Sequence, residues 1–532
     1  MKKTLLFIFL LTLWCNVFIE KVFSQDILWE KSLGGKHADY LFDAQPTADY
    51  GFILAGSSLS GKTGKKTDVN NGDLDYWLWK MNEKGDLDWQ KSFGGNKSDL
   101  LQCVKLTKDA GFILVGTSDS DIGIHKKDSC RGKEDIWIIK LNAQGGEEWQ
   151  KTIGGSGQEL VQTISETTDG GYIIGASSSS DQSGEKEING RGALDYWIIK
   201  LDSKGNIEWQ KTYGGIYNDI LKSLVPTYDG GYIVGGYSNS PESIDKTERN
   251  LGPGDYWILK LDKLGELEWQ KTLGGDRDDN FQTLIQTKEG DYLIGGNSNS
   301  GVSNAKSKSN RSGTDFWVLR MDKQGEIVWQ ETYNFGKLDI LTSIVEEKEG
   351  TFILAGFAKS EVIGTKKQDK EDVNDYAIIK IKADGEEIWK KTVGSAAEEI
   401  LQKVIITRDG GYLLTGTSNG KASKDKKSSV GSNDFWVVKL KNEKKPKEEK
   451  ESIEAFPNPT NQFTNVIIGY EYEKGTCAVY DLAGRQLQKF DINKDRTIPV
   501  DLANLPQGIY IIEISTDVQK NGVKVMKSTN KK

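Results

Sequence analysis

Seven acidic residues recur at a strict spacing of 60, each after a glycine-rich turn. They are Asp39, Asp99, Glu159, Asp219, Asp279, Asp339 and Glu399. Carboxylates that share one site raise each other's pKa unless a cation binds between them, and carboxylate oxygens are the ligands that calcium prefers. If these residues ring the mouth of a channel, we expect a site there for a polar ligand or for calcium.

The same spacing also has a structural explanation. Each carboxylate can accept backbone N–H bonds from its own Gly-Gly turn or pair with a nearby lysine, and repetition in every unit favours such a role. A second set of acids is interpreted in the same way, as caps for the long loops that precede them. This set is Asp75, Asp135, Asp195, Asp255, Asp315, Asp375 and Asp434.

Catalytic motifs are scarce in this chain. The only histidines, His37 and His125, fall in different repeats, and no GxSxG, HExxH or P-loop motif occurs. Two carboxylates near an axis could still hydrolyse glycosidic bonds, so a carbohydrate-active enzyme is one alternative. Because nothing distinguishes one pair from the other repeated acids, we predict no catalytic residue.

Two tryptophan series mark the same repeat and indicate what the repeated units are. A large ring at a fixed place in every unit is expected to fill the gap between neighbouring units. The first series is Trp29, Trp89, Trp149, Trp209, Trp269, Trp329 and Trp389. The second is Trp77, Trp137, Trp197, Trp257, Trp317 and Trp436, with Ala377 in its place in one unit.

Each unit is predicted to form four short strands. Within residues 159–212, the strands "ELVQTISET", "YIIGASS", "DYWIIKL" and "NIEWQKT" are rich in β-branched and aromatic residues. Tight turns, "TDGG" and "DSKG", join the first strand to the second and the third to the fourth. The second and third strands are joined by a long polar loop at 178–194. Repeats of about this length form solenoids or propellers.

The two ends of the repeat region favour a closed ring. Residues 26–33 supply a lone fourth strand, and the last unit, which ends near residue 440, lacks one. We therefore predict an all-β fold in which residues 26–440 form a seven-bladed β-propeller, closed by its N-terminal strand in the last blade. The long loops then lie on one face, which is where long loops most often bind ligands.

The N-terminal 24 residues have the pattern of a secretory signal. "MKK" is followed by the apolar run "TLLFIFLLTLW", and "VFS" places cleavage between Ser24 and Gln25. We expect no transmembrane segment after its removal. The net charge of −8 argues against a nucleic-acid partner. Three cysteines remain, at positions 103, 130 and 477, and we expect isolated thiols.

The sequence changes character after residue 440. Residues 441–453 read as a charged linker, and residues 454–532 are predicted to form a small β-sandwich. Four motifs mark this segment: "FPNPT" at 456–460, "VYDLAGRQL" at 479–487, "DLANLPQGIYIIEI" at 501–514 and "VKVMK" at 523–527.

These motifs, in their order and spacing, resemble the type A C-terminal sorting domain of type IX secretion cargo. The resemblance implies that secretion machinery carries the chain across the outer membrane of a Gram-negative bacterium, to be released or held at the cell surface. The residues that carry it are Pro457, Asn458, Pro459, Tyr480, Asp481, Gly484, Arg485, Gly508 and Tyr510. The 60-residue repeat resembles a propeller repeat of surface and secreted proteins with this domain, which implies no activity.

We therefore expect a secreted or surface-displayed binding protein whose long-loop face holds a glycan or a surface protein. We expect no cofactor other than calcium at the seven repeated acids. Two alternatives stay open. One is the carbohydrate-active enzyme, and the other is a structural component of the cell envelope without a small ligand.

Overall fold

The computed structural model describes residues 26–360, 373–441, 453–460 and 462–528. The predicted signal peptide, with its cleavage site after Ser24, and nearly all of the predicted linker lie outside these residues. The described chain is built of 35 strands. No helix in these four segments is long and apolar enough to cross a membrane.

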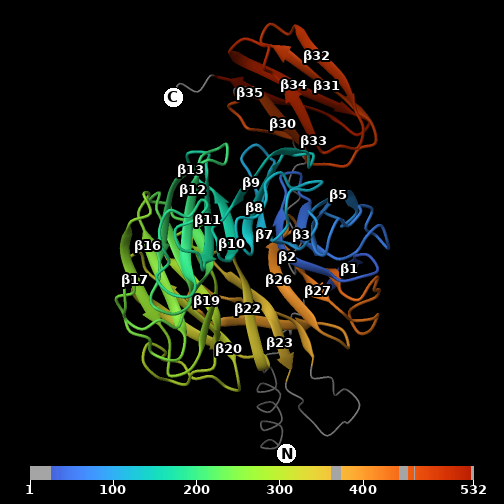
Figure 1. Cartoon of the computed structure of the whole chain (residues 1–532). Helices are drawn as coiled ribbons and strands as arrows, with labels where there is room; N and C mark the ends of the chain where they lie inside the picture. The colour runs from blue at the N-terminus through green and yellow to red at the C-terminus, as the bar shows by residue number, and fades with distance from the viewer. Residues whose placement is uncertain (1–25, 361–372, 442–452, 461, 529–532) are drawn as a thin grey trace, which may run out of the picture.

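Seven four-stranded antiparallel sheets form the blades of a propeller (Figure 1), as the repeat predicts. Blade 1 comprises β2 (Asp39–Pro46), β3 (Phe52–Ser58), β4 (Asp75–Met81) and β5 (Leu87–Phe93). Blade 2 comprises β6 (Asp99–Leu106), β7 (Phe112–Ser118), β8 (Asp135–Leu141) and β9 (Glu147–Ile153). Blade 3 comprises β10 (Glu159–Glu166), β11 (Tyr172–Ser178), β12 (Asp195–Leu201) and β13 (Ile207–Tyr213). Blade 4 comprises β14 (Asp219–Pro226), β15 (Tyr232–Ser238), β16 (Asp255–Leu261) and β17 (Leu267–Leu273). Blade 5 comprises β18 (Asp279–Gln286), β19 (Tyr292–Ser298), β20 (Asp315–Met321) and β21 (Ile327–Tyr333). Blade 6 comprises β22 (Gly336–Glu346), β23 (Phe352–Ser360), β24 (Asn374–Ile381) and β25 (Glu387–Val393).

Blade 7 confirms the predicted closure of the ring. It contains β26 (Glu399–Ile406), β27 (Tyr412–Ser418) and β28 (Asp434–Leu440), and its outer strand is the N-terminal β1 (Ile27–Leu33). β1 pairs antiparallel with β28, with Lys31 opposite Val437. The first strand of the chain therefore covers the edge that the last blade would otherwise expose.

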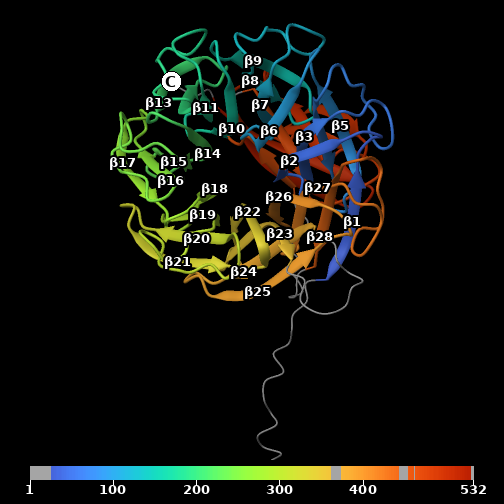
Figure 2. The same cartoon turned by 60° about the horizontal axis from the view of Figure 1, so that its bottom comes forward.

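The first strand of each sheet lies nearest the centre of the ring, as Figure 2 shows. Neighbouring inner strands contact one another around the ring, and β2 contacts both β6 and β26. Asp39 pairs with Ser58, which pairs with Asp75, so the inner strands begin on the face where the loops between second and third strands emerge. We call this the long-loop face and the opposite one the short-turn face.

Both tryptophan series pack between blades, as predicted. Trp257 is fully buried, and its ring centroid lies 4.9 Å from that of Tyr196 in the preceding blade. Trp149, in the other series, lies against a turn of the next blade at Gly205, where an added Cβ would sit 2.8 Å from the indole ring. Gly205 also has a φ of +80°, which glycine adopts without strain.

One glutamine in the outer strand holds the tryptophan and the long loop of its blade together. In blade 3, Gln210 Oε1 accepts hydrogen bonds from Trp197 Nε1 at 2.9 Å and from the loop N–H of Glu187 at 3.2 Å. Gln210 Nε2 donates to the loop carbonyl of Glu185 at 2.7 Å. We call this arrangement the glutamine clamp. It recurs at Gln90, Gln150, Gln210, Gln270 and Gln330.

The two remaining blades show what the glutamine clamp is for. In blade 6, Ala377 replaces the tryptophan, and Lys390 stands where the glutamine would be. In blade 7, Glu30 of the closing strand takes over the position and accepts from Trp436 Nε1 at 2.8 Å and from the Lys427 N–H at 3.1 Å. The glutamine is thus present where an indole N–H needs an acceptor, and the closing strand supplies a carboxylate instead.

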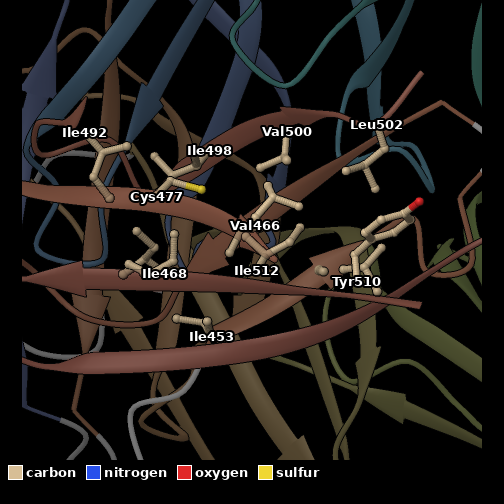
Figure 3. Packing of buried hydrophobic residues seen from close by; sticks show 14 of the residues in the cluster. Ile453, Val466, Ile468, Cys477, Ile492, Ile498, Val500, Leu502, Tyr510 and Ile512 are labelled. Atoms are coloured by element: carbon tan, nitrogen blue, oxygen red, sulfur yellow. The ribbon is translucent and has the colours of Figure 1, made fainter. Parts of the chain in front are cut away.

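The C-terminal segment forms the predicted small sandwich. One sheet holds β29 (Ile453–Phe456), β30 (Phe463–Ile468) and β33 (Thr497–Asp501). The other holds β31 (Gly475–Asp481), β32 (Gln486–Ile492), β34 (Gly508–Thr516) and β35 (Lys520–Lys527). Figure 3 shows its core, in which Val466, Cys477 and Ile512 are fully buried. All three cysteines of the described chain are free thiols, as expected.

The glutamine clamp predicts a loss of stability when its amide is removed. Gln210→Leu leaves the buried Trp197 N–H without an acceptor, and an unsatisfied buried donor costs roughly 1–3 kcal/mol. We expect a lower denaturant midpoint for Gln210→Leu, measured by tryptophan fluorescence. Lys390→Leu, at the same position of the blade that lacks the tryptophan, is the matched control and should change the midpoint little. Equal losses in the two variants would contradict the role of the clamp.

Candidate functional site

The seven repeated acids lie at the long-loop ends of the inner strands, but they are buried. Each has 0% exposure, so they do not form the open ring at a channel mouth that the sequence suggested. Asp219 Oδ2 accepts from the Gly215 N–H at 2.7 Å and from Ser240 Oγ at 2.9 Å. In all seven, the carboxylate accepts the N–H of the residue four positions earlier: Gly35, Gly95, Gly155, Gly215, Gly275, Phe335 and Ser395.

These bonds are those of the structural alternative. Burial raises the pKa of Asp219, and the bonds from Gly215 and the serines of β15 and its loop offset part of that rise. The seven acids lie at the predicted place along their strands, because the spacing of the repeat determines that place. Their exposure differs from the prediction, because it depends on how closely the next blade packs against them. Ligand or calcium binding by these acids stays a prediction.

Six acids of the second set cap the long loops, as interpreted from the sequence. Most of the loop before the seventh, Asp375, lies outside the described residues. Asp195 Oδ2 accepts the N–H of Arg191 at 2.6 Å, and Asp255 does the same with Leu251 at 2.7 Å. Burial raises the pKa of Asp195 from its ordinary value of 3.8 to about 6, with Asp219 of the next inner strand adding to the rise. The pKa of Asp75, Asp135, Asp255 and Asp375 is likewise raised to about 6, first by burial.

The two sets of acids meet at the first glycine of the Gly-Gly turn. A Cβ added to Gly34 would lie 2.7 Å from Asp39 Oδ2 and 2.8 Å from Asp434 Oδ1, which belong to adjacent blades. Two carboxylates therefore fill the space that a side chain would need. The Gly-Gly motif is explained by this close approach rather than by contact with a ligand.

A buried lysine in each described long loop is the main polar feature that sequence reasoning missed. Lys246 Nζ donates to the Glu248 carbonyl and to Asn250 Oδ1, both at 2.8 Å, and burial lowers its pKa. The set is Lys66, Lys126, Lys186, Lys246, Lys306 and Lys426, each with at most 2% exposure. Their spacing in multiples of 60 was the signal, hidden in loops that otherwise vary.

The described parts of the chain contain no group of three or more His, Cys, Asp or Glu side chains placed to hold a metal ion. The inner strands instead bring cations together with one acid. Lys105 and Lys403 lie 3.9 and 4.0 Å from the two carboxylate oxygens of Asp43. Burial lowers the pKa of Lys403. The inner wall of the ring is therefore not a continuous array of carboxylates.

The residues of the sorting motifs hold the small sandwich together. Asn458 Nδ2 donates to the Lys524 carbonyl at 2.8 Å, and Asn458 Oδ1 accepts the Met526 N–H at 2.9 Å, so one amide fixes β35. Arg485 Nε donates to Asp481 Oδ2 at 2.7 Å across the turn that contains Gly484. Buried Tyr510 donates its hydroxyl to a backbone carbonyl at Pro506.

Four further motif positions complete this set. Pro457 accepts a hydrogen bond from Thr464 through its carbonyl, Pro459 follows Asn458 in the same turn, and Gly508 opens β34. Tyr480 lies in β31. Lys527, which ends the closing motif, donates Nζ to three carbonyls at 2.6–2.7 Å, from Leu502, Ala503 and Leu505.

The sandwich contacts the short-turn face of the propeller (Figure 1). Lys84, in a turn of blade 1, lies 2.6 Å from Glu471, and Asn465 Nδ2 donates to the Asp109 carbonyl of blade 2 at 2.7 Å. Arg408 of blade 7 donates to the Gly469 carbonyl at 3.1 Å. These contacts leave the long-loop face uncovered by the C-terminal sandwich.

Comparison with known proteins identifies the C-terminal sandwich. Residues 454–528 match the family model of the secretion system C-terminal sorting domain, which confirms the resemblance. The chain is therefore a secreted or cell-surface protein of a Gram-negative bacterium of the Bacteroidetes type.

The chain is also similar to proteins of diverse kinds. It is 20% identical over 340 residues to the regulatory protein FlaEY of Caulobacter vibrioides, a match that covers 59% of this chain and about a third, 35%, of that relative's length. Among solved structures, the Pan2 WD40 domain of Neurospora crassa has 11% identity and a TM-score of 0.37, over 80% of this chain and 99% of that one. Hydrazine synthase of Kuenenia stuttgartiensis has 8% identity and a TM-score of 0.41, over 75% and 95%.

The capping acids predict an unusual dependence of stability on pH. Because the pKa of Asp195 is about 6 in the folded chain and 3.8 without burial, folding favours its protonated form. The stability that protonated Asp195 adds to the folded chain is complete below its unfolded pKa of 3.8 and is lost as the pH rises through about 6. We expect the melting temperature to fall between about pH 5 and about pH 7.

Asp195→Asn tests this expectation directly. It should raise the melting temperature at neutral pH and flatten the pH profile, because the amide keeps an acceptor for Arg191 without the charge. Asp121→Asn, on an exposed loop residue, is the control. A melting temperature that is higher at about pH 7 than at about pH 5, in the wild type, would contradict the assignment.

Proposed function

We propose that the chain, exported by its type IX sorting domain, is a surface or secreted binding protein that holds a glycan or a protein ligand on its long-loop face. The observation that carries this proposal is the difference between the two faces. The short-turn face has tight turns and contacts the sorting domain, whereas the long-loop face bears six described long loops and is uncovered.

The construction of the long loops supports a binding role. In blades 1 to 5 the glutamine clamp and the buried lysine fix the base of the loop, and in blade 7 Glu30 and Lys426 occupy these positions. The tips differ from blade to blade and expose apolar side chains, such as Ile124 at 77%, Ile122 at 65% and Val302 at 63%. Constant bases with variable, exposed tips are how loops on a rigid scaffold supply binding residues.

The alternatives have less support from the described residues. Thirteen of the fourteen repeated acids are buried, and the other, Asp375, is partly exposed. The seven acids of the inner strands also accept backbone N–H bonds, so no pair of them is open to a substrate. A purely structural envelope component would not require loops of different sequence in successive blades.

Changing the exposed loop tips should remove ligand binding. The variant Ile122→Ser, Ile124→Ser and Ile244→Ser alters three exposed apolar residues without touching a clamp or a buried lysine. We expect its signal on a glycan array, or in capture of purified surface proteins, to drop by about tenfold or more. Tyr228→Ser with Leu264→Ser, on exposed residues of the short turns, is the control. Equal binding by both variants would refute a long-loop site.

Removing the sorting domain should block export. A chain that ends after residue 453 should stay inside the cell envelope, whereas the full chain reaches the medium or the cell surface. Immunoblotting of fractionated cells measures this, with protease accessibility of intact cells as the surface assay. Unchanged export of the shortened chain would overturn the role of residues 454–528.

A further inference from the structure

A pocket of about 360 Å³ lies between the inner strands of blades 1 and 7, on the long-loop face. Tyr40 and Phe42 line it from blade 1, and Gln402 lines it from blade 7. Asn419, Asn433 and Glu398 line its outer rim, where the loops of blade 7 begin and end. This volume is within the usual range for small-molecule sites.

The aromatic rings of Tyr40 and Phe42 do not recur in the other blades, unlike the residues that pack the blades together. The other inner strands carry aliphatic residues or asparagine at the position of Tyr40: Leu100, Leu160, Ile220, Asn280, Ile340 and Ile400. At the position of Phe42 they carry Gln102, Gln162, Lys222, Gln282, Thr342 and Gln402. A residue that every blade needs for packing would recur seven times, whereas a residue that contacts a ligand can occur in one blade alone.

The rings are also not required by the core. Leu41, which lies between them, is fully buried in the apolar cluster shared by blades 1 and 7. Tyr40 and Phe42 alternate with it on the strand, are only partly buried and belong to no buried cluster of the described chain. Both rings line the same pocket, so they present adjacent apolar surfaces to a ligand there.

The polar lining suits hydroxyl groups. Gln402, Asn419 and Asn433 each carry both a donor and an acceptor, which match the two roles of a sugar hydroxyl. Asn419 Oδ1 accepts the Glu398 N–H at 3.0 Å, which fixes the plane of this amide and leaves Nδ2 as a donor. Aromatic rings contact the C–H faces of a sugar ring, and amides at the edge contact its hydroxyls.

The charge of the lining selects among sugars. Among the described residues that line the pocket, Glu398 is the one carboxylate and none is a lysine or an arginine. A carboxylate without a neighbouring cation accepts hydrogen bonds from a neutral diol and repels an acidic sugar. We propose that this pocket binds one unit of a neutral saccharide, stacked on Tyr40 and Phe42. This inference rests on the proposed function of the long-loop face and names its ligand class.

The test replaces the two rings with residues that neighbouring blades carry at the same positions. The double variant Tyr40→Leu and Phe42→Gln should fold, because blades 2 and 3 have these residues there. The full secreted chain is applied to an array of neutral oligosaccharides of glucose, galactose, mannose and N-acetylglucosamine, with polygalacturonate as an acidic probe. Titration calorimetry then follows the best neutral binder.

We expect binding of the neutral oligosaccharide to weaken by about tenfold or more in the double variant. Gln162→Thr, which places the blade 6 residue in blade 3, should leave it unchanged. Unchanged neutral binding in the double variant, or preference for polygalacturonate, would overturn the pocket but leave the long-loop proposal standing.

Two further outcomes separate the inference from the function on which it rests. A blank array together with protein capture that the loop-tip variant abolishes would overturn the saccharide and keep the binding face. A blank array together with protein capture that the loop-tip variant leaves unchanged, or with no capture at all, would overturn both.

Discussion

Blades 1 to 5 depend on the side-chain amide of one outer-strand glutamine. It accepts from the buried tryptophan and from a loop N–H and donates to a loop carbonyl, so it joins the interblade core to the long loop. Buried polar groups are costly unless every partner is present. A blade therefore has both the tryptophan and an acceptor for its N–H, or neither. Blade 6, with Ala377 and Lys390 at these positions, has neither. The rigid base of the long-loop face follows from this constraint.

The burial of the repeated charges separates structure from binding in this fold. Acids, serines and lysines that recur every 60 residues bond to one another and to the backbone inside the blades. The ligand contacts that we propose are instead residues that do not recur, at loop tips and at the seam between blades 1 and 7. In a repeat protein, then, regularity indicates the framework, and its local interruption indicates the site.

The ring, its closure and the packing role of the tryptophans were all predictable from the 60-residue spacing. The repeat shows how many strands there are and where each residue lies along its strand. The exposure of Asp219 and its equivalents was not predictable, because phase along a strand does not say how far the next blade covers it. Lys246 and its equivalents were missed although they share the spacing, because the loops around them vary. The pocket at Tyr40 needed the structure, which alone shows that blade 7 faces it.

The closing strand has a kinetic consequence. β1 and β28 are separated by almost the whole propeller, so the ring forms its last sheet only when distant segments meet, and such non-local pairing is slow. Until then β28 has an open edge, and the strand that fits it is present in every other copy of the chain. Exchange of β1 between two incomplete rings would use the same Glu30 contacts, so such an exchange would link two chains into a dimer.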